Sequence, residues 1–77
     1  MSKLQIVDAQ KMEKLLLHLQ FNKTRQKGSH AFFRHDDGRT TTIPYHPGKD
    51  LTRPLIRKIL NDINLNIQEY HEMLKKL

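Results

Sequence analysis

The sequence predicts an α+β domain in which a three-stranded antiparallel sheet has helices on one face. Apolar residues recur at helical spacing toward both ends of the chain, whereas residues 21–44 alternate with the period of two typical of strands. Turn residues divide that middle stretch into three short segments. A chain of 77 residues has room for one modest core, so we expect one domain spanning residues 1–77.

Helices are expected on both sides of the strands. The first follows Asp8, a favourable N-cap, and its apolar stripe is formed by Met12, Leu15, Leu16 and Leu19. The second follows Thr52 and has Pro54 in its first turn, where a missing N–H costs nothing. Its apolar face is formed by Leu55, Ile56, Ile59, Leu60 and Ile63. Asn66 and Glu69 resemble a capping box at the start of a short last helix, marked by Ile67, Tyr70, Leu74 and Leu77.

The predicted strands cover residues 21–25, 30–35 and 39–44. Asp37-Gly38 between the second and third is typical of a two-residue type I′ hairpin turn. Lys27-Gly28-Ser29 indicates a looser turn between the first and second. The expected order of elements is therefore α-β-β-β-α-α.

The alternation within the strands predicts which side chains share a face. One parity points four residues toward the helices: Ala31, Phe33, Thr41 and Ile43. It leaves the other sheet face open and places His30, Phe32 and Arg34 on it in one row. We favour this arrangement, although the sequence leaves open the opposite parity, which buries His30 and Phe32.

The positive charge of the chain is concentrated in its middle. The formal net charge is +6, and residues 23–58 hold nine Lys and Arg against three Asp, so this segment carries the whole surplus. Such a segment is the electrostatic footprint expected of a protein that binds a phosphate backbone. A solvated basic surface or a site for an acidic protein partner would have the same composition.

The composition also excludes some classes of site and compartment. There is no cysteine, which excludes disulfides and thiolate metal sites. Residues 1–8 contain no stretch long enough for a signal peptide, and nothing later resembles a membrane span. We therefore expect a cytoplasmic protein without a membrane anchor.

The segment Arg25-Gln26-Lys27-Gly28-Ser29-His30 is the densest polar cluster in the chain. Gly28 allows close approach of a ligand, Ser29 offers a hydroxyl and an N–H, and Arg25 and Lys27 offer charge to phosphate. His30 follows this turn, and an imidazole is a side chain that can take a proton from a ribose 2′-hydroxyl or return one to the leaving 5′-oxygen. Such chemistry needs no metal or cofactor. The simpler interpretation is an ordinary turn followed by an ordinary strand-edge histidine.

Several motifs together resemble the HicA toxins of prokaryotic toxin–antitoxin pairs. From the first helix to Ile63 they are the cluster at residues 25–30, Phe33-Arg34-His35, Asp37-Gly38-Arg39, Thr42-Ile43-Pro44, His46-Pro47-Gly48-Lys49 and Leu55-Ile56-Arg57-Lys58-Ile59-Leu60. The resemblance implies a double-stranded-RNA-binding-like α-β-β-β-α fold, ribosome-independent mRNA cleavage and inhibition by a HicB antitoxin. It places the catalytic histidine at His30 and the family's glycine at Gly28. This chain departs from the family in Arg53-Pro54, where a glycine is common, and in its added tail after Asn64, which would form the extra helix.

The resulting hypothesis is a metal-independent endoribonuclease toxin that cleaves single-stranded mRNA through acid–base chemistry at His30. Arg25, Lys27, Gly28, Ser29 and Arg34 would bind the RNA. The alternatives are a non-catalytic RNA-binding module and a protein-interaction subunit. His35 and His46 are candidates for a second proton-transfer group, and a zinc site formed by them with His30 matches no standard spacing. Phe32 and Tyr45 are candidates for stacking on unpaired bases.

Overall fold

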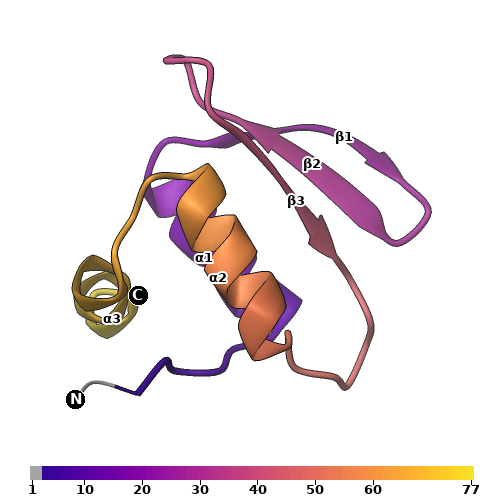
Figure 1. Cartoon of the computed structure of the whole chain (residues 1–77). Helices are drawn as coiled ribbons and strands as arrows, with labels where there is room; N and C mark the ends of the chain where they lie inside the picture. Colours follow the sequence, from indigo (N-terminus) through magenta and orange to yellow (C-terminus); the bar gives the residue numbers. More distant parts are fainter. Residues whose placement is uncertain (1–2) are drawn as a thin grey trace.

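The computed structural model describes residues 3–77 and has the predicted order of elements (Figure 1). The elements are α1 (Ala9–His18), β1 (Asn22–Lys27), β2 (His30–Arg34), β3 (Thr40–Pro44), α2 (Arg53–Asp62) and α3 (Ile67–Lys75). The strands form one antiparallel sheet in the order β1-β2-β3. The α+β fold predicted from the sequence is thus confirmed. Within residues 3–77, no helix is both long and apolar enough to cross a lipid bilayer.

The helices begin at the caps that the sequence predicts. The Asp8 carboxylate accepts a hydrogen bond from the backbone N–H three residues on at 2.8 Å, and the Thr52 hydroxyl does the same at 3.4 Å. Asn66 and Glu69 form a reciprocal capping box, with side chain to backbone distances of 2.7 and 2.9 Å. Leu77, expected on the last apolar stripe, is instead exposed, because α3 ends at Lys75.

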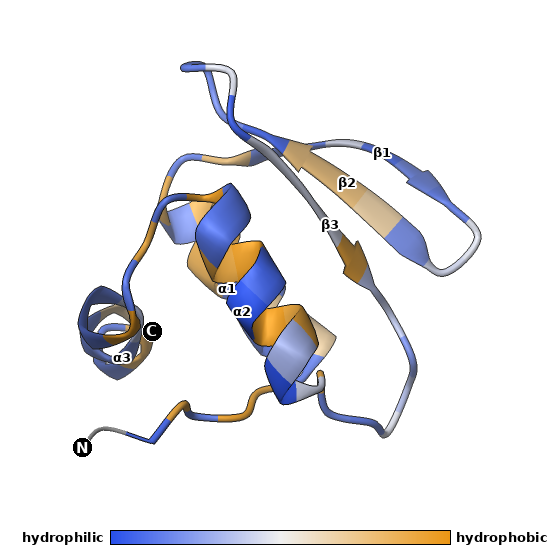
Figure 2. Ribbon diagram, in the orientation of Figure 1, coloured by the Kyte–Doolittle hydropathy of each residue, from blue (hydrophilic) through white to orange (hydrophobic). Residues whose placement is uncertain are grey.

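The helices lie on one side of the sheet, and the favoured strand parity is confirmed (Figure 1). Ala31 faces Ile43 and Phe33 faces Thr41 across β2 and β3, and all four side chains are buried. Figure 2 shows apolar residues on β2, near the end of β3 and on α2, whereas β1 is mostly hydrophilic. The even-numbered residues of β2 therefore point to the open side of the sheet.

The two hairpin turns differ from the prediction, because the tight turn is the one between β1 and β2. Lys27 pairs directly with His30, which leaves Gly28-Ser29 as a two-residue loop. Gly28 has φ +58°, whereas the φ of Ser29 is not positive. A type II′ turn has this pattern, with glycine at its first central position. Of the two sequence segments that suggested hairpin turns, this one is therefore the more compact.

The loop between β2 and β3 is not the predicted type I′ turn. The His35 N–H donates to the Arg39 carbonyl and the Gly38 N–H to the His35 carbonyl, both at 2.9 Å, so the loop has three residues. Only Gly38 has a positive φ, of +99°. The Asp37 carboxylate accepts the Arg39 backbone N–H at 3.0 Å, which closes the turn without a left-handed aspartate. As a result, β3 begins at Thr40 rather than at residue 39.

The N-terminal segment and α3 pack together against the other helices. Leu4 and Val7 are buried, as are Tyr70 and Leu74 of α3. The Tyr70 hydroxyl donates to the Gln5 carbonyl at 2.7 Å, and burial raises the pKa of Tyr70 to about 12. These contacts complete the core on the side away from the sheet. The helices of residues 3–77 leave the opposite face of the sheet open (Figure 1).

Candidate nucleic-acid interface

The outward residues of β2 form one row on the open sheet face. His30 and Arg34 are exposed and Phe32 is half-buried, in alternation with buried Ala31 and Phe33. Their partners on β3 are Pro44, Thr42 and Thr40. Since strands rise about 3.3 Å per residue, His30 and Arg34 are about 13 Å apart along β2. One phosphate cannot contact both side chains, so Arg34 is suited to a neighbouring phosphate.

A β-bulge at Thr24 brings Arg25 onto this face. The register of β1 against β2 shifts between Lys23, which pairs with Phe33, and Arg25, which pairs with Phe32. The Arg25 guanidinium lies 4.6 Å from the centroid of the Phe32 ring, within the range of a cation–π contact. Nothing in the sequence indicates this bulge, since Thr24 is an ordinary strand residue.

Lys27 is the cation positioned nearest to His30. The two residues are direct cross-strand partners, and side chains at such positions have Cβ atoms roughly 4.5–5.5 Å apart. Both are exposed and both border the Gly28-Ser29 turn. No heavy atom lies within 4 Å of where a Cβ on Gly28 would be, so the space above the turn is open to a ligand. Of the predicted cluster at residues 25–30, Arg25, Lys27 and His30 therefore share the open face, whereas Gln26 pairs with inward-facing Ala31.

The His30 imidazole has no hydrogen-bond or ion-pair partner among residues 3–77. An unpartnered, exposed imidazole is free to exchange a proton with a bound molecule. It also lacks the second group that commonly orients a catalytic histidine.

His35 lies at the other end of β2 and is engaged in the hairpin loop. Its Nδ1 accepts the Asp37 backbone N–H at 3.0 Å, and its ring contacts the edge of Phe21 at a centroid distance of 5.1 Å. Hydrogen bonds from the Arg39 backbone and side chain, together with nearby positive charge, hold the pKa of Asp37 below its usual range. His35 thus lies at the end of the hairpin, as expected from the strand parity that buries Ala31 and Phe33. Within residues 3–77, no three His, Asp or Glu side chains gather as metal ligands.

A shallow hollow on the open face lies beside the Arg25–Phe32 pair. Its lining combines guanidinium groups, hydroxyls and the Phe32 ring, from Thr24, Arg25, Phe32, Arg34, Thr40 and Thr42, among others. Hydroxyls and guanidinium groups bind phosphate and sugar oxygens, while an aromatic ring accepts a flat apolar group. The hollow therefore offers the polar and apolar contacts that a nucleotide requires.

Tyr45 anchors the loop after β3 to the helices, in a network that the sequence does not indicate. Its hydroxyl donates to the Glu13 carboxylate of α1, which also pairs with Lys23 of β1 at 3.3 Å. Burial and the neighbouring carboxylate raise the pKa of Tyr45, so the phenol stays protonated. In this position Tyr45 packs against the helices, which is a different role from the stacking on unpaired bases for which it was a candidate. Its participants lie far apart in sequence, which is why no local pattern marks them.

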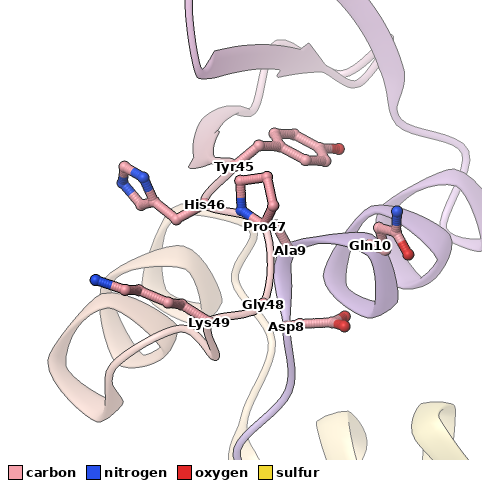
Figure 3. A pocket seen from close by; sticks show the side chains of 8 residues that line it. All are labelled: Asp8, Ala9, Gln10, Tyr45, His46, Pro47, Gly48 and Lys49. Atoms are coloured by element: carbon pink, nitrogen blue, oxygen red, sulfur yellow. The ribbon is translucent and has the colours of Figure 1, made fainter.

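Figure 3 shows Tyr45 beside a cleft between the start of α1 and the loop before α2. The cleft is lined by residues 8–10 and 45–49. His46 and Lys49 project to the same side of the loop, away from Asp8 and Gln10 (Figure 3). His46 follows Pro44, the β3 partner of His30, by two residues. Unlike His35, it is exposed, and its side chain makes no hydrogen bond or ion pair within residues 3–77.

Fold and surface together define a small α+β domain whose uncovered sheet face carries cations, an aromatic ring and a free imidazole. A protein-family model described as the HicA toxin of bacterial toxin–antitoxin matches residues 9–65, from α1 to just beyond α2. This chain belongs to the HicA toxin family, and it is the toxin partner of an antitoxin. No curated protein matches the sequence significantly. The segments outside the family match are the N-terminal segment and α3.

Proposed function

We propose that this toxin is an endoribonuclease that cleaves single-stranded mRNA in the cytoplasm and is inhibited by a HicB-type antitoxin. The observation that carries the proposal is the direct pairing of Lys27 with His30 beside the open Gly28-Ser29 turn. This pairing supports the proposal because a cation, the backbone N–H groups of the turn and an imidazole are the groups that phosphate binding and proton transfer would use. The family match supports the toxin role.

In the proposed reaction the substrate supplies its own nucleophile. His30 takes the proton from the 2′-hydroxyl, the 2′-oxygen attacks the adjacent phosphorus, and the bond to the 5′-oxygen breaks. The products are a 2′,3′-cyclic phosphate and a 5′-hydroxyl, whose proton is returned by the medium or by His30. Lys27 and the N–H groups of the turn stabilise the charge that develops on the phosphate. Arg25 and Arg34 hold neighbouring phosphates, and no step requires a metal ion.

The test is cleavage of an unstructured RNA by the wild type and by His30→Ala, with a chelator present. General acid–base catalysis typically contributes about 10²–10⁴-fold, so we expect the variant to lose that much activity. His18→Ala is the matched control, because His18 is an exposed histidine on the last turn of α1. RNA with a 2′-deoxy sugar at the cleavage site should resist the wild type. Equal cleavage by wild type and His30→Ala would remove His30 from the mechanism.

A second candidate is a non-catalytic RNA-binding module. The absence of an orienting partner for His30 within residues 3–77 favours it, since catalytic histidines are commonly held by a third group. This candidate predicts RNA binding without cleavage and the same cellular toxicity for wild type and His30→Ala. The cleavage assay therefore distinguishes the two functions.

A further inference from the structure

The basic groups of the middle segment divide into two surfaces. Among residues 3–77, carboxylates pair with Lys23, Arg39 and Lys58. The remaining cations of residues 23–58 have no such pair. Three belong to the open sheet face, namely Arg25, Lys27 and Arg34, and three belong to the loop before α2 and to α2 itself, namely Lys49, Arg53 and Arg57. We call the second group the α2 cationic surface; all its members are exposed.

The positions of these cations are unfavourable for the isolated helix. Arg53 is the first residue of α2, at the end where the backbone dipole is positive, and the first turn has no acidic residue. Arg57 lies one turn further along the same helix face, and like charges at this spacing repel each other. Neither arginine has an acidic partner that would offset this cost. A bound anion would relieve both repulsions at once.

The α2 cationic surface begins at the end of the sheet that carries His30. Pro44, the last residue of β3, is the cross-strand partner of His30, and the loop that follows leads directly into α2. The Tyr45 N–H donates to the Ser29 carbonyl at 2.6 Å, which ties the start of this loop to the β1–β2 turn. Lys49 projects from the loop to the side opposite Asp8 and Gln10 (Figure 3). The loop thus joins the His30 end of the sheet to α2, so a chain that crosses His30 toward β3 would next meet Lys49 and the arginines of α2.

We propose that the α2 cationic surface binds the phosphate backbone of the same RNA strand, beyond the bond that is cleaved. This inference rests on the proposed function and extends the RNA footprint from the sheet to the first two turns of α2. Arginine favours this ligand, because its planar fork matches the oxygens of a phosphate. An acidic antitoxin would find the same charge, but continuity with the cations around His30 favours one extended strand as the occupant.

The test compares the salt dependence of RNA binding for two charge-neutralised variants of the full chain. The probe is a single-stranded 2′-O-methyl RNA, which lacks the free nucleophile and stays intact, of about 20 nucleotides, longer than the roughly 4–16 that one small fold commonly covers. Arg53→Gln/Arg57→Gln removes two of the proposed contacts. Lys75→Gln/Lys76→Gln removes two exposed cations at the end of α3 and is the matched control. Thermal unfolding checks that both variants are folded.

Two lost phosphate contacts should lower the slope of log K against log salt by about 1.4 for single-stranded RNA, and the control should keep the wild-type slope. If the slope for Arg53→Gln/Arg57→Gln equals that of the control variant, the inference is overturned. The proposed function would still stand in that case, provided that the wild type cleaves ordinary RNA. Escape of Arg53→Gln/Arg57→Gln from the antitoxin with an unchanged RNA slope would assign the surface to the antitoxin and also overturn it. Failure of the wild type to bind or cleave RNA would overturn both.

Discussion

Phe32 lies at the centre of the open sheet face, with the Arg25 guanidinium beside its ring. The hydroxyls of Thr40 and Thr42 border the same hollow. A flat base can extend this stack, because both an aromatic ring and a guanidinium plane accept stacking partners. At the scale of single residues, Phe32 is therefore the group that would hold a base next to the cleaved phosphate.

Replacing Phe32 with leucine should weaken binding of single-stranded RNA by about 1–3 kcal/mol, or roughly 5- to 150-fold, because one stacked base loses its platform. Phe32 is only half-buried, so the folded state should tolerate the change. Phe32→Tyr keeps the ring and should bind RNA like the wild type. Fluorescence anisotropy with the 2′-O-methyl RNA measures both variants. Wild-type affinity of Phe32→Leu would show that no base stacks at this position.

Among the elements, α3 is attached through the buried side chains of Tyr70 and Leu74 and through hydrogen bonds to the N-terminal segment. Tyr70 is fully buried, and its hydroxyl donates to the Gln5 carbonyl. The next residue, His71, accepts the Gln5 backbone N–H at 3.1 Å through Nε2. The N-terminal segment is thus held by α3 through both backbone polar groups of one residue, Gln5. Neither segment belongs to the part of the chain that matches the family.

Tyr70→Phe should lower the free energy of unfolding by about 0.5–1.5 kcal/mol near neutral pH, the usual net value of one hydrogen bond. The pH dependence gives a sharper check. Burial raises the pKa of Tyr70 from 10.0 to about 12, so the unfolded chain ionises first. This contribution to stability is complete below pH 10 and is lost as the pH rises to about 12.

Urea unfolding across the alkaline range measures this effect. The wild type should lose stability more steeply above pH 10 than Tyr70→Phe, because the variant has no phenol to ionise at this position. Tyr45 adds the same alkaline loss to both proteins, because its raised pKa keeps it protonated in the folded state while the unfolded chain ionises it, so the difference between the two curves reports Tyr70. Parallel curves for wild type and Tyr70→Phe would contradict the buried, neutral state of Tyr70.

The elements were predictable where local chemistry determines them. Asp8, Thr52 and Asn66 cap their helices because short polar side chains reach the free N–H groups of the first turn, whatever the rest of the chain does. The strand parity followed from the apolar residues that a one-sided sheet must bury. The closeness of Arg25, Lys27 and His30 could likewise be expected, since they are near one another in sequence, while their role in RNA binding and cleavage stays a prediction.

The remaining features depend on tertiary contacts. The bulge at Thr24 exists because β1 must accommodate one more residue than β2 offers for pairing, which no single residue reveals. The contacts of Glu13 with Lys23 and Tyr45 join α1, β1 and a loop, and they form only after these elements have packed. In the β2–β3 loop, the hydrogen bond from the Arg39 N–H to the Asp37 carboxylate stabilises a turn other than the expected type I′ turn.

At the scale of the whole molecule, the side chains that stabilise the fold and those that would bind RNA lie on different faces of the sheet. The helices of residues 3–77 pack on one side of the sheet (Figure 1). Ala31, Phe33 and Ile43 are buried on that side. Arg25, Lys27 and Arg34 belong to the other side. Lys27, His30 and Phe32 contribute no buried surface comparable to that of Phe33 or Ile43. Changes on the open face should therefore alter RNA binding much more than folding, whereas changes around α3 should do the reverse.

Truncation of the chain after Leu65 tests this separation. It retains the family-matched residues 9–65 but removes Tyr70 and Leu74, whose burial contributes about 1.5–3 kcal/mol each. The expected loss of about 3–6 kcal/mol is large beside the roughly 5–15 kcal/mol total stability of a domain, and a chain this short lies toward the lower end. Leu4 and Val7 would also be uncovered, since α3 holds the segment that contains them.

Urea unfolding of the truncated chain should show a much lower midpoint, or no cooperative transition, at neutral pH. Removal of residues 76–77 alone is the control, because both are exposed and lie beyond the last turn of α3. RNA binding at low temperature should persist in whatever fraction of the truncated chain remains folded, because the open sheet face is intact. A truncated chain with wild-type stability would mean that α3 is an appendage to a core that is already complete without it.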